Sequence, residues 1–341
     1  MGGARRGFTY RLMQYKVHFS PSNYYYTFSS ENPLTPSQFF SQHPKNIEEF
    51  PTDYLRVVDL SVVLDDDVVC PTKDLTNIVP TVQRSSSRST VLSFDGHALL
   101  ELSPLRENQL RIHPDLGKIA PTMQQSAALI ALRHGAAKSG RAILHASAVE
   151  TANRGLVLLG DTRAGKSTFS VMASLSNSCL LSDDLILIEF DEASDRPLGY
   201  AARQNFTLRK DIAESCTQLP LEQLKKISTA EGTKYVIPRE SGLVRTVSSM
   251  GLDHMLFCKG FSGGGTTEIK KLNKAEYYAL LLENFFPMFG ENFRIFKQEQ
   301  ESTLELVSVL HNKCNGYAIE IGTDILKSPE LTMNNLIHQM S

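Results

Sequence analysis

The sequence predicts an α/β fold with a β-rich N-terminal part, and three observations lead to this prediction. Strand-like runs separated by polar turns fill residues 54–114. From residue 141 onward, strand-sized apolar runs alternate with segments of helical periodicity, which is typical of an α/β core. Between one such strand and one such helix lies a glycine-rich stretch, GDTRAGKS, at residues 160–167.

Length and composition place the chain among ordinary globular proteins. Its 341 residues indicate about two domains, and 41% of them are hydrophobic and 21% charged. A net charge of -2 gives no global electrostatic reason to bind nucleic acid or an anionic membrane. The longest apolar runs are strand-sized, well short of the roughly 18 residues that a membrane-spanning helix needs. We therefore expect neither nucleic acid nor a membrane as a partner.

The cysteines and the N-terminal residues bear on the cellular location. The five cysteines are scattered, odd in number and free of any CxxC pair, which argues against a disulfide framework and against a zinc site. The N-terminal segment carries two arginines with no apolar stretch behind them, so we expect no secretory signal. Both observations favour a reducing, cytoplasmic location.

In the N-terminal part, the sequence patterns of secondary structure are clearer after residue 50 than before it. Residues 1–50 are aromatic and polar with poor periodicity, and two interpretations stay open: an irregular extension packed on the body, or a recognition arm that uses exposed tyrosines. Residues 84–90, RSSSRST, are expected to form a loop. We expect strands within residues 54–64, 89–102 and 108–114.

A helix is expected between Pro121 and Gly140, because apolar residues recur there at helical spacing and these two residues are typical of a helix start and stop. We place the domain boundary at this helix. Residues 1–120 then form a β-rich N-terminal domain with a possible role in substrate recognition, and residues 121–341 form the domain that carries the glycine-rich stretch.

The remaining elements follow from residue 141 onward. Residues 141–150 and 154–160 are buried-type strands, and 168–176 is helical. Residues 179–190 are one strand, or two joined by a turn. Residues 255–272 are expected to form a hairpin with a glycine-rich tip. Helices are expected at 274–286, 302–314 and 328–339, with a strand at 316–322.

Residues Gly160 to Ser167 match the P-loop pattern GxxxxGK[ST] in full, and this P-loop comes after an apolar strand and at the start of a helix. Glycines let the backbone wrap around phosphate oxygens, and successive N–H groups form a nest for anions at a helix N-terminus. Lys166 supplies a charge for the phosphates, and the Ser167 hydroxyl is a ligand for Mg²⁺. The alternative is a glycine turn without a ligand. The predicted phosphate-binding residues are Gly160, Asp161, Thr162, Arg163, Ala164, Gly165, Lys166, Ser167 and Thr168.

Two adjacent acids, Asp183 and Asp184, follow Lys166 by seventeen and eighteen residues. We expect them at the end of a strand that neighbours the P-loop strand, where a carboxylate can bind Mg²⁺ or act as a general base. One of the two would hold the metal and the other would face the attacking hydroxyl; a simple turn between strands is the alternative. His145 lies in the strand before the P-loop strand, and a single histidine in a strand is ordinarily a core residue.

Three segments together, HASAVE (145–150), GLVLLGDTRAGKST (155–168) and LLSDDLILI (180–188), resemble the HPr kinase/phosphorylase superfamily. The resemblance implies a P-loop core of the phosphoenolpyruvate-carboxykinase-like type and ATP as the nucleotide. It makes His145, Lys166 and Asp184 catalytic, with Asp184 as the general base on the acceptor hydroxyl. It is good over residues 140–190 and weak toward the C-terminus. There it looks like HPr-kinase-related proteins of peptide-modification gene clusters, some of which phosphorylate a serine of a precursor peptide.

The chain departs from this family at two motifs. The Glu-Arg-Gly signature is missing, and the corresponding stretch 204–214 holds Thr207, Arg209 and Lys210, so the second metal ligand is unassigned. The Pro-Gly-Arg-Asn element is also missing; Arg239 or Arg245, in the stretch 237–245, would replace its arginine. These losses argue against HPr itself as the substrate and against phosphorolysis, and leave a kinase as the expectation.

The sequence thus predicts an ATP- and Mg²⁺-dependent kinase that phosphorylates a hydroxyl, foremost a serine or threonine of a peptide or protein. A small-molecule hydroxyl kinase and a nucleotide-binding switch without transfer are the alternatives. Because the resembling family often assembles, a homo-oligomer stays open. The predicted catalytic residues are His145, Lys166, Asp184 and Arg239, and the predicted metal ligands are Ser167, Asp183 and Asp184.

Overall fold

The structure of the chain is a computed structural model, and the fold is described for part of the sequence. In the N-terminal part it describes the backbone of seven strands, given below, and residues 133–134 and 136–137. From there on it describes residues 140–201, 205–216, 218–229, 232–261, 265–285 and 297–340. The chain divides into two compact units, one made of residues 1–20 and 24–135 and the other of residues 21–23 and 136–341. Helices and several sheets confirm the mixed α/β class.

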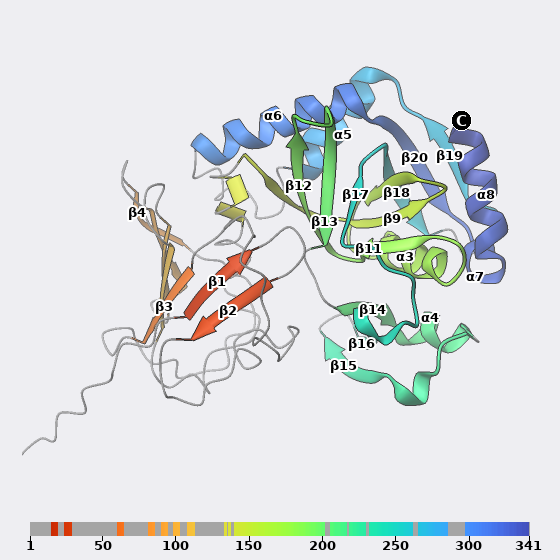
Figure 1. Cartoon of the computed structure of the whole chain (residues 1–341), viewed down its shortest axis with the longest axis horizontal. Coiled ribbons are helices and arrows are strands. Elements are labelled where there is room, and N and C mark those ends of the chain that lie inside the picture. Colours follow the sequence, from red (N-terminus) through yellow and green to blue (C-terminus); the bar gives the residue numbers. More distant parts are fainter. Residues whose placement is uncertain are drawn as a thin grey trace, which may run out of the picture. The chain divides into compact units, whose positions relative to one another are not determined.

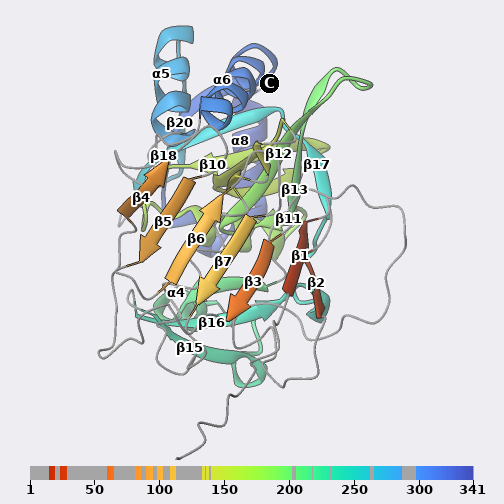
Figure 2. The same ribbon diagram turned by 90° about the vertical axis from the view of Figure 1, so that its left-hand side faces the viewer.

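The N-terminal unit contains a seven-stranded sheet, whose strands lie side by side in Figure 2. All neighbouring strands are antiparallel except one parallel pair, β3 with β7. In sheet order the strands are β2 (Tyr24–Phe28), β1 (Tyr15–Phe19), β3 (Leu60–Leu64), β7 (Asn108–Ile112), β6 (Ala98–Leu102), β5 (Thr90–Phe94) and β4 (Thr81–Ser85).

The strand predictions for residues 54–114 are confirmed by β3, β5, β6 and β7. The sequence did not predict three of the strands in this unit. β1 and β2 lie where the periodicity is poor, and β4 takes the first two residues of the expected loop 84–90. Of the helix expected between Pro121 and Gly140, residues 133–134 and 136–137 are helical, and most of the rest lies outside the described residues.

The C-terminal unit is built on a six-stranded mixed sheet (Figure 1). Its three central strands, β10, β18 and β20, are parallel, and the outer strands run antiparallel to their neighbours. In sheet order the strands are β11 (Cys179–Ser182), β9 (Ser147–Thr151), β10 (Arg154–Leu159), β18 (His254–Phe261), β20 (Asn315–Ile321) and β19 (Glu268–Lys271). Because β9 lies between β10 and β11, the strand before the two acids does not neighbour the P-loop strand, contrary to the expectation.

The hairpin expected over residues 255–272 is wrong. β18 and β19 do not pair, since β20 lies between them and pairs with both. The physical reason is burial: the first five residues of β18 are buried, so this strand needs neighbours and covering layers on every side, whereas β19 is largely exposed and suits an edge. Gly263 and Gly264 of the expected tip lie outside the described residues.

Two segments with strand-like sequences are each divided into two strands, and both points of division lie at the candidate site described below. Residues 141–150 divide into β8 (Ala142–His145) and β9, which belong to different sheets. Residues 179–190 divide into β11 and β12 (Leu185–Asp191), as the two-strand alternative predicted. The backbone N–H of Ala146 donates to the carbonyl oxygen of Asp184 at 2.8 Å, so one hydrogen bond joins the two breaks.

Two smaller sheets complete the unit. One is four-stranded, in the order β17 (Ser249–Gly251), β13 (Arg196–Ala201), β12 and β8. The other is three-stranded, in the order β14 (Asn205–Arg209), β16 (Gly232–Pro238) and β15 (Lys225–Thr229). The helix α4 (Lys210–Ser215) follows β14 directly. Figure 1 shows the three-stranded sheet and α4 next to the helix α3 (Lys166–Ser174).

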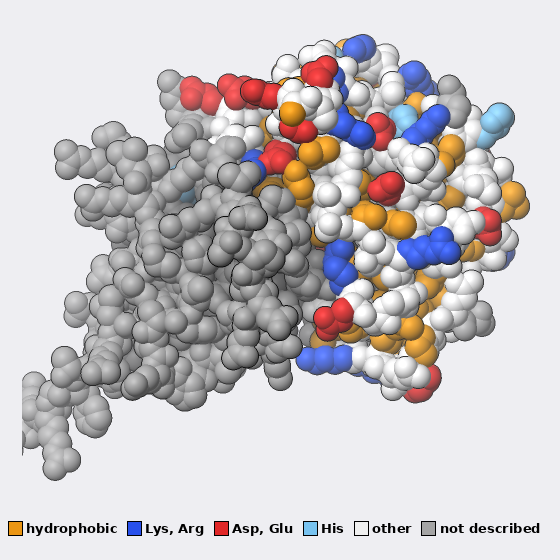
Figure 3. Space-filling view, in the orientation of Figure 1, with side chains coloured by type: hydrophobic (Ala, Val, Ile, Leu, Met, Phe, Trp, Pro, Cys, Tyr) orange, Lys and Arg blue, Asp and Glu red, His pale blue; other side chains and the backbone are white. Residues whose placement is uncertain are grey.

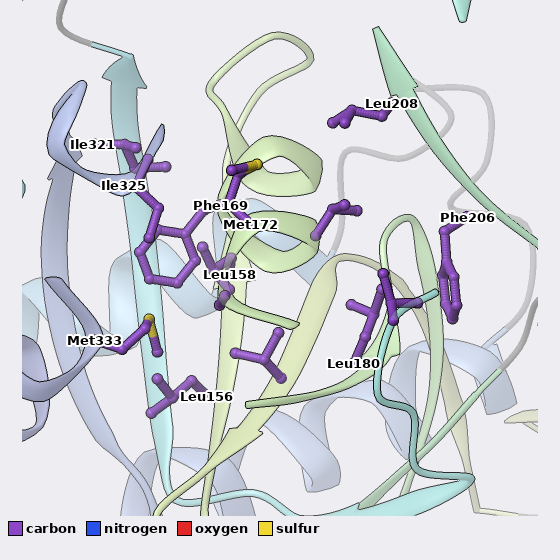
Figure 4. Close-up of a cluster of buried hydrophobic side chains, with 14 of the residues drawn as sticks. Leu156, Leu158, Phe169, Met172, Leu180, Phe206, Leu208, Ile321, Ile325 and Met333 are labelled. Atoms are coloured by element: carbon purple, nitrogen blue, oxygen red, sulfur yellow. The ribbon is translucent and has the colours of Figure 1, made fainter. Parts of the chain in front are cut away.

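Alternate residues of β10 face two hydrophobic cores, because side chains alternate along a strand. Leu156 and Leu158 pack with Phe169 of α3, as Figure 4 shows. Val157 and Leu159 pack on the other face, against the helices that cover it. The helices are α5 (Lys274–Phe285) and α6 (Lys297–Lys313) on this second face, and α7 (Asp324–Lys327) and α8 (Pro329–Met340) on the first. The predicted helices α5, α6 and α8 are confirmed, and the short α7 was not predicted.

No helix among the described residues combines the length and the apolar character needed to cross a bilayer. On the face drawn in Figure 3, acidic and basic side chains of the described part are interspersed. Such a mixed surface is typical of globular domains.

His254 is a buried histidine at the start of β18, in edge-to-face contact with the ring of Tyr317 at 5.6 Å between centroids. Neither of its ring nitrogens has a hydrogen-bond partner within the described part of the chain. Burial is the main cause that lowers its pKa below the ordinary value of 6.5. Asp253 acts in the opposite direction, and Arg154 and Lys271 add to the lowering.

This histidine makes the stability depend on pH. As pH falls through about 6.5, the unfolded chain binds a proton at residue 254 that the folded chain resists, so the free energy of unfolding decreases toward acid. His254→Phe keeps an aromatic ring and removes the titration. We therefore expect a shallower decrease of stability between about pH 7.5 and 5.5 in urea denaturation than in the wild type. The exposed His338→Phe variant is the control, and equal slopes for wild type and His254→Phe would contradict the prediction.

Candidate active site

The P-loop leaves the carboxyl end of β10 and needs both of its motif glycines. Gly160 has φ +130°, and a Cβ atom there would lie 2.7 Å from the carbonyl oxygen of Cys258 on β18. Gly165 has φ +94°, and its Cβ would lie 3.1 Å from Ile321 at the end of β20. Glycine alone combines this backbone with so close an approach. The loop therefore lies at the carboxyl edge of three parallel strands, where open α/β sheets bind ligands.

Helix α3 begins directly after the loop. Gly165 is its N-cap residue and has no side chain to accept a hydrogen bond from the first turn. The N–H groups of that turn and the positive end of the helix dipole are thus available to an anion. The nine residues of α3 pack with β9, β11 and β14, which fixes the direction of its N-terminus.

Lys166 lies buried at the centre of the loop. Its ammonium group donates to the carbonyl oxygens of Gly160 at 2.6 Å and Asp161 at 2.9 Å. These bonds hold the loop around the charge. A phosphate oxygen that approached the loop would meet this ammonium group as a point charge surrounded by backbone N–H groups.

The turn between β11 and β12 is fastened to the P-loop through its backbone. The carbonyl oxygen of Asp183 accepts a hydrogen bond from the Ser167 hydroxyl at 2.9 Å and from the Ser147 hydroxyl at 2.7 Å. Ser167 is the last residue of the motif, and Ser147 begins β9. The acidic turn, the first turn of α3 and the break between β8 and β9 are therefore held together as one structure.

The side chains of His145 and Asp184 face each other where β8 ends and β12 begins. The Nδ1 atom of His145 lies 3.2 Å from Oδ1 of Asp184, and the two side chains are 40% and 22% exposed. His145 ends β8, and it pairs in register with Leu185, which begins β12. The structure thus brings together the three residues that the family resemblance made catalytic: His145, Asp184 and, across the loop, Lys166.

Asp183 faces the other way. Its side chain is 1% exposed, and its Oδ2 atom accepts hydrogen bonds from the backbone N–H of Thr207 at 2.7 Å and from the Thr207 hydroxyl at 3.1 Å. Its side chain does not line the cavity described below. Neighbouring residues of an extended turn point to opposite sides. One acid of the predicted pair therefore faces the site, and the other holds β14 in place.

Arg239, also predicted as catalytic, lies behind the acidic turn. Its guanidinium group donates to the carbonyl oxygens of Leu181 and of Val247, the latter at 2.7 Å, and stacks over the ring of Phe206 at 5.1 Å. Burial lowers the pKa of Arg239 to about 10, and the charge of Asp183 opposes this shift. Arg239 is not among the residues that line the cavity. Its contacts hold the end of β11, directly before the two acids.

A cavity of about 310 Å³ opens between the P-loop and the β14–α4 segment. One side is formed by the loop with His145 and Asp184, and the other by strand β14, helix α4 and strand β16. The lining residues are His145, Thr162, Arg163, Gly165, Lys166, Ser167, Thr168, Asp184, Thr207, Leu208, Arg209, Asp211, Ile212, Lys234 and Phe261.

Sequence reasoning missed part of this lining. Phe261, Leu208, Asp211 and Ile212 carry no motif, and in the sequence they look like any strand end or short helix. Phe261 closes the cavity because β18 ends beside the P-loop, which only the parallel pairing of β18 with β10 brings about. No pattern of neighbouring residues contains that information.

The residues present fit a bound Mg²⁺ ion. Mg²⁺ prefers oxygen ligands and is usually held by one or two protein groups together with waters and substrate phosphates. The Ser167 hydroxyl and the Asp184 carboxylate both line the cavity and supply such oxygens. In the described ranges no group of three or more His, Cys, Asp or Glu side chains gathers as a metal cage.

No protein-family model and no curated protein matches the chain. Among solved structures, it is similar to the Hpr(Ser) kinase/phosphatase from Coxiella burnetii, at 12% identity and a TM-score of 0.29. The match covers 58% of this chain and 92% of that one. At this level of similarity, the roles of individual residues rest on the geometry of this chain.

Proposed function

We propose that the chain is an ATP- and Mg²⁺-dependent kinase that transfers the γ-phosphate to a hydroxyl group. The observation that carries this proposal is that one cavity is lined both by the P-loop with Lys166 and by the carboxylate of Asp184 beside His145. A phosphate-binding loop alone fits any nucleotide-binding protein. A carboxylate beside this loop adds a group that accepts a proton, and transfer to a hydroxyl needs such a group. The resemblance of residues 140–190 to HPr kinase/phosphorylase proteins supports the same reaction.

In the proposed step, the oxygen of the acceptor hydroxyl forms a bond to the γ-phosphorus. The bond from that phosphorus to the oxygen bridging the β- and γ-phosphates breaks, and ADP leaves with the electron pair. The hydroxyl proton goes to Asp184, whose orientation His145 holds through the 3.2 Å contact. Lys166 and the N–H groups of the loop stabilise charge on the phosphates. When bound through Ser167 and the phosphates, Mg²⁺ would offset further charge.

A peptide or protein serine or threonine is the acceptor we favour. The volume of about 310 Å³ is at the low end for pockets that enclose a small ligand, and the phosphates of a nucleotide would occupy much of it. An acceptor that reaches in from outside, as a side chain on a peptide does, suits such a site better than a second enclosed molecule.

The test is phosphoryl transfer from γ-labelled ATP in the presence of Mg²⁺ to separate peptide and metabolite fractions of the source cells. We expect label in the peptide fraction. Lys166→Ala removes the charge at the centre of the loop and is expected to lower the transfer rate about 10²–10³-fold. Lys210→Ala is the matched control, since Lys210 is an exposed lysine paired with Glu214 outside the cavity lining.

The other outcomes are also informative. Label in the metabolite fraction alone would replace the peptide acceptor with a small molecule. Tight nucleotide binding without transfer to either fraction would contradict a kinase and leave a nucleotide-binding switch. Equal transfer by the wild type and Lys166→Ala would overturn the role of the loop.

A further inference from the structure

Ser147 places a hydroxyl group in an otherwise apolar stretch of the C-terminal unit. It begins β9, pairs in register with Leu158 of β10 and is completely buried. The residues on either side of it, Ala146 and Ala148, are completely buried as well. Because side chains alternate along a strand, Ser147 faces the same side as Val149, which belongs to the core around α3. A hydroxyl costs free energy in such a place unless it forms a hydrogen bond.

The hydrogen bond of Ser147 leads to the candidate site. Its hydroxyl donates to the carbonyl oxygen of Asp183 at 2.7 Å, and the Ser167 hydroxyl donates to the same oxygen at 2.9 Å. A carbonyl oxygen has two lone pairs, which match these two donors. The direction of the carbonyl group is therefore held from two sides, by β9 and by the first turn of α3.

This carbonyl group determines how Ser167 presents its hydroxyl to the cavity. A hydroxyl has one proton to donate and two lone pairs to accept. Because the proton of Ser167 points to the Asp183 carbonyl, the lone pairs are left for the cavity, which Ser167 lines. A cation binds a lone pair, so this orientation suits Mg²⁺. If the carbonyl turned away, the hydroxyl could rotate and point its proton into the cavity.

The turn that carries the two acids has further hydrogen bonds, but they act elsewhere. The backbone N–H of Ala146 donates to the carbonyl oxygen of Asp184 at 2.8 Å. The Ser182 hydroxyl donates to the carbonyl oxygen of Leu185 at 2.7 Å. Neither of these two acceptors is the carbonyl that Ser167 contacts. The hydrogen bond from Ser147 ends on that carbonyl and so couples β9 to the P-loop hydroxyl.

We infer that Ser147 is a positioning residue for the Mg²⁺ ion of the kinase: it holds the Asp183 carbonyl, and that carbonyl orients the Ser167 hydroxyl as a metal ligand. This inference rests on the proposed function. Groups that hydrogen-bond to a metal ligand orient it, and their loss typically lowers metal affinity or activity about 10–100-fold. Ser147 acts one hydrogen bond further out, so we expect an effect at the lower end of this range.

The test separates the contribution of the metal from that of the nucleotide. Calorimetry measures the affinity of the full chain for a non-hydrolysable ATP analogue, once with saturating Mg²⁺ and once with EDTA. The ratio of the two affinities is the contribution of the metal. In Ser147→Ala we expect this ratio to fall about tenfold. The affinity in EDTA is expected to stay within a few-fold of wild type, because the contacts of Lys166 and the loop N–H groups remain.

Ser174→Ala is the matched control. Ser174 is a buried serine at the end of α3 whose hydroxyl donates to the carbonyl oxygen of Val171 at 2.7 Å, and it does not line the cavity. Removing it deletes a buried hydrogen bond of the same length without touching the Asp183 carbonyl. We expect a lower melting temperature and an unchanged affinity ratio. A merely structural role of Ser147 would give the same result in Ser147→Ala and would overturn the inference.

A double-mutant cycle tests whether Ser147 acts through Ser167. Ser167→Ala removes the hydroxyl that the carbonyl orients. In that background we expect Ser147→Ala to lower the affinity ratio no further. A further fall as large as in the wild-type background would overturn the inference, since Ser147 would then act by another route. A Ser147→Ala chain that no longer unfolds cooperatively would also overturn it, because the serine would then hold the fold as a whole.

Failure of this inference is distinguishable from failure of the proposed function. A wild type that does not bind the ATP analogue, with or without Mg²⁺, contradicts the proposed function itself. A wild type whose affinity rises with Mg²⁺, together with the same ratio in Ser147→Ala, contradicts this inference alone.

Discussion

Asp184→Asn is expected to lower the rate of phosphoryl transfer about 10²–10⁴-fold while nucleotide affinity changes only a few-fold. The amide keeps the shape of the side chain and an oxygen to face His145, but it cannot accept the hydroxyl proton. Transfer therefore loses its base, whereas the P-loop contacts to the phosphates stay intact. Steady-state rates with γ-labelled ATP and titration with a fluorescent ATP analogue measure the two effects separately.

Asp191→Asn is the matched control for this substitution. Asp191 lies at the far end of the same strand, β12, where it is half-buried and accepts hydrogen bonds from the following turn. Unchanged transfer in Asp184→Asn would show that another group takes the proton. A loss of affinity as large as the loss of rate would instead make Asp184 a metal ligand.

Asp183→Ala is expected to destabilise the fold by about 3–5 kcal/mol. The buried carboxylate accepts two hydrogen bonds from Thr207 and carries the charge that opposes the lowered pKa of Arg239. Alanine leaves the backbone N–H of Thr207 without its acceptor and the half-buried guanidinium of Arg239 without the opposing charge of Asp183. Urea denaturation of the nucleotide-free chain measures the loss.

Asp183→Asn separates the two causes. The amide oxygen can still accept from Thr207, but the charge is gone. We expect a loss well below that of alanine if the hydrogen bonds dominate. A loss equal to that of alanine would show that the charge facing Arg239 dominates, and wild-type stability in Asp183→Ala would contradict the structural role altogether.

Local patterns predicted the parts of the fold that neighbouring residues decide. The helices α5, α6 and α8 and the strands β3, β5, β6 and β7 follow from periodicity within single segments. The pairing of strands does not follow from periodicity. The chain places β20 between β18 and β19 because the first five residues of β18 are buried, and the expected hairpin therefore does not form.

The candidate site divides in the same way. The stretch from Gly160 to Ser167 lies between a strand and a helix, as its pattern predicts, since glycine conformations and motif spacing are local properties. The family resemblance made both His145 and Asp184 catalytic, but their spacing along the chain does not imply that they lie close together. The cavity side formed by Leu208 and Ile212 had no signal in the sequence.

By itself, the sequence determined the α/β class, the position of the P-loop and the presence of two acids after a buried strand. Only the tertiary structure decided that Asp184 faces the cavity while Asp183 and Arg239 hold the turn from behind. The reason is physical. Two adjacent carboxylates are chemically equivalent along the chain, and they differ only once β14 supplies buried N–H and hydroxyl donors to one of them and β8 places a histidine beside the other.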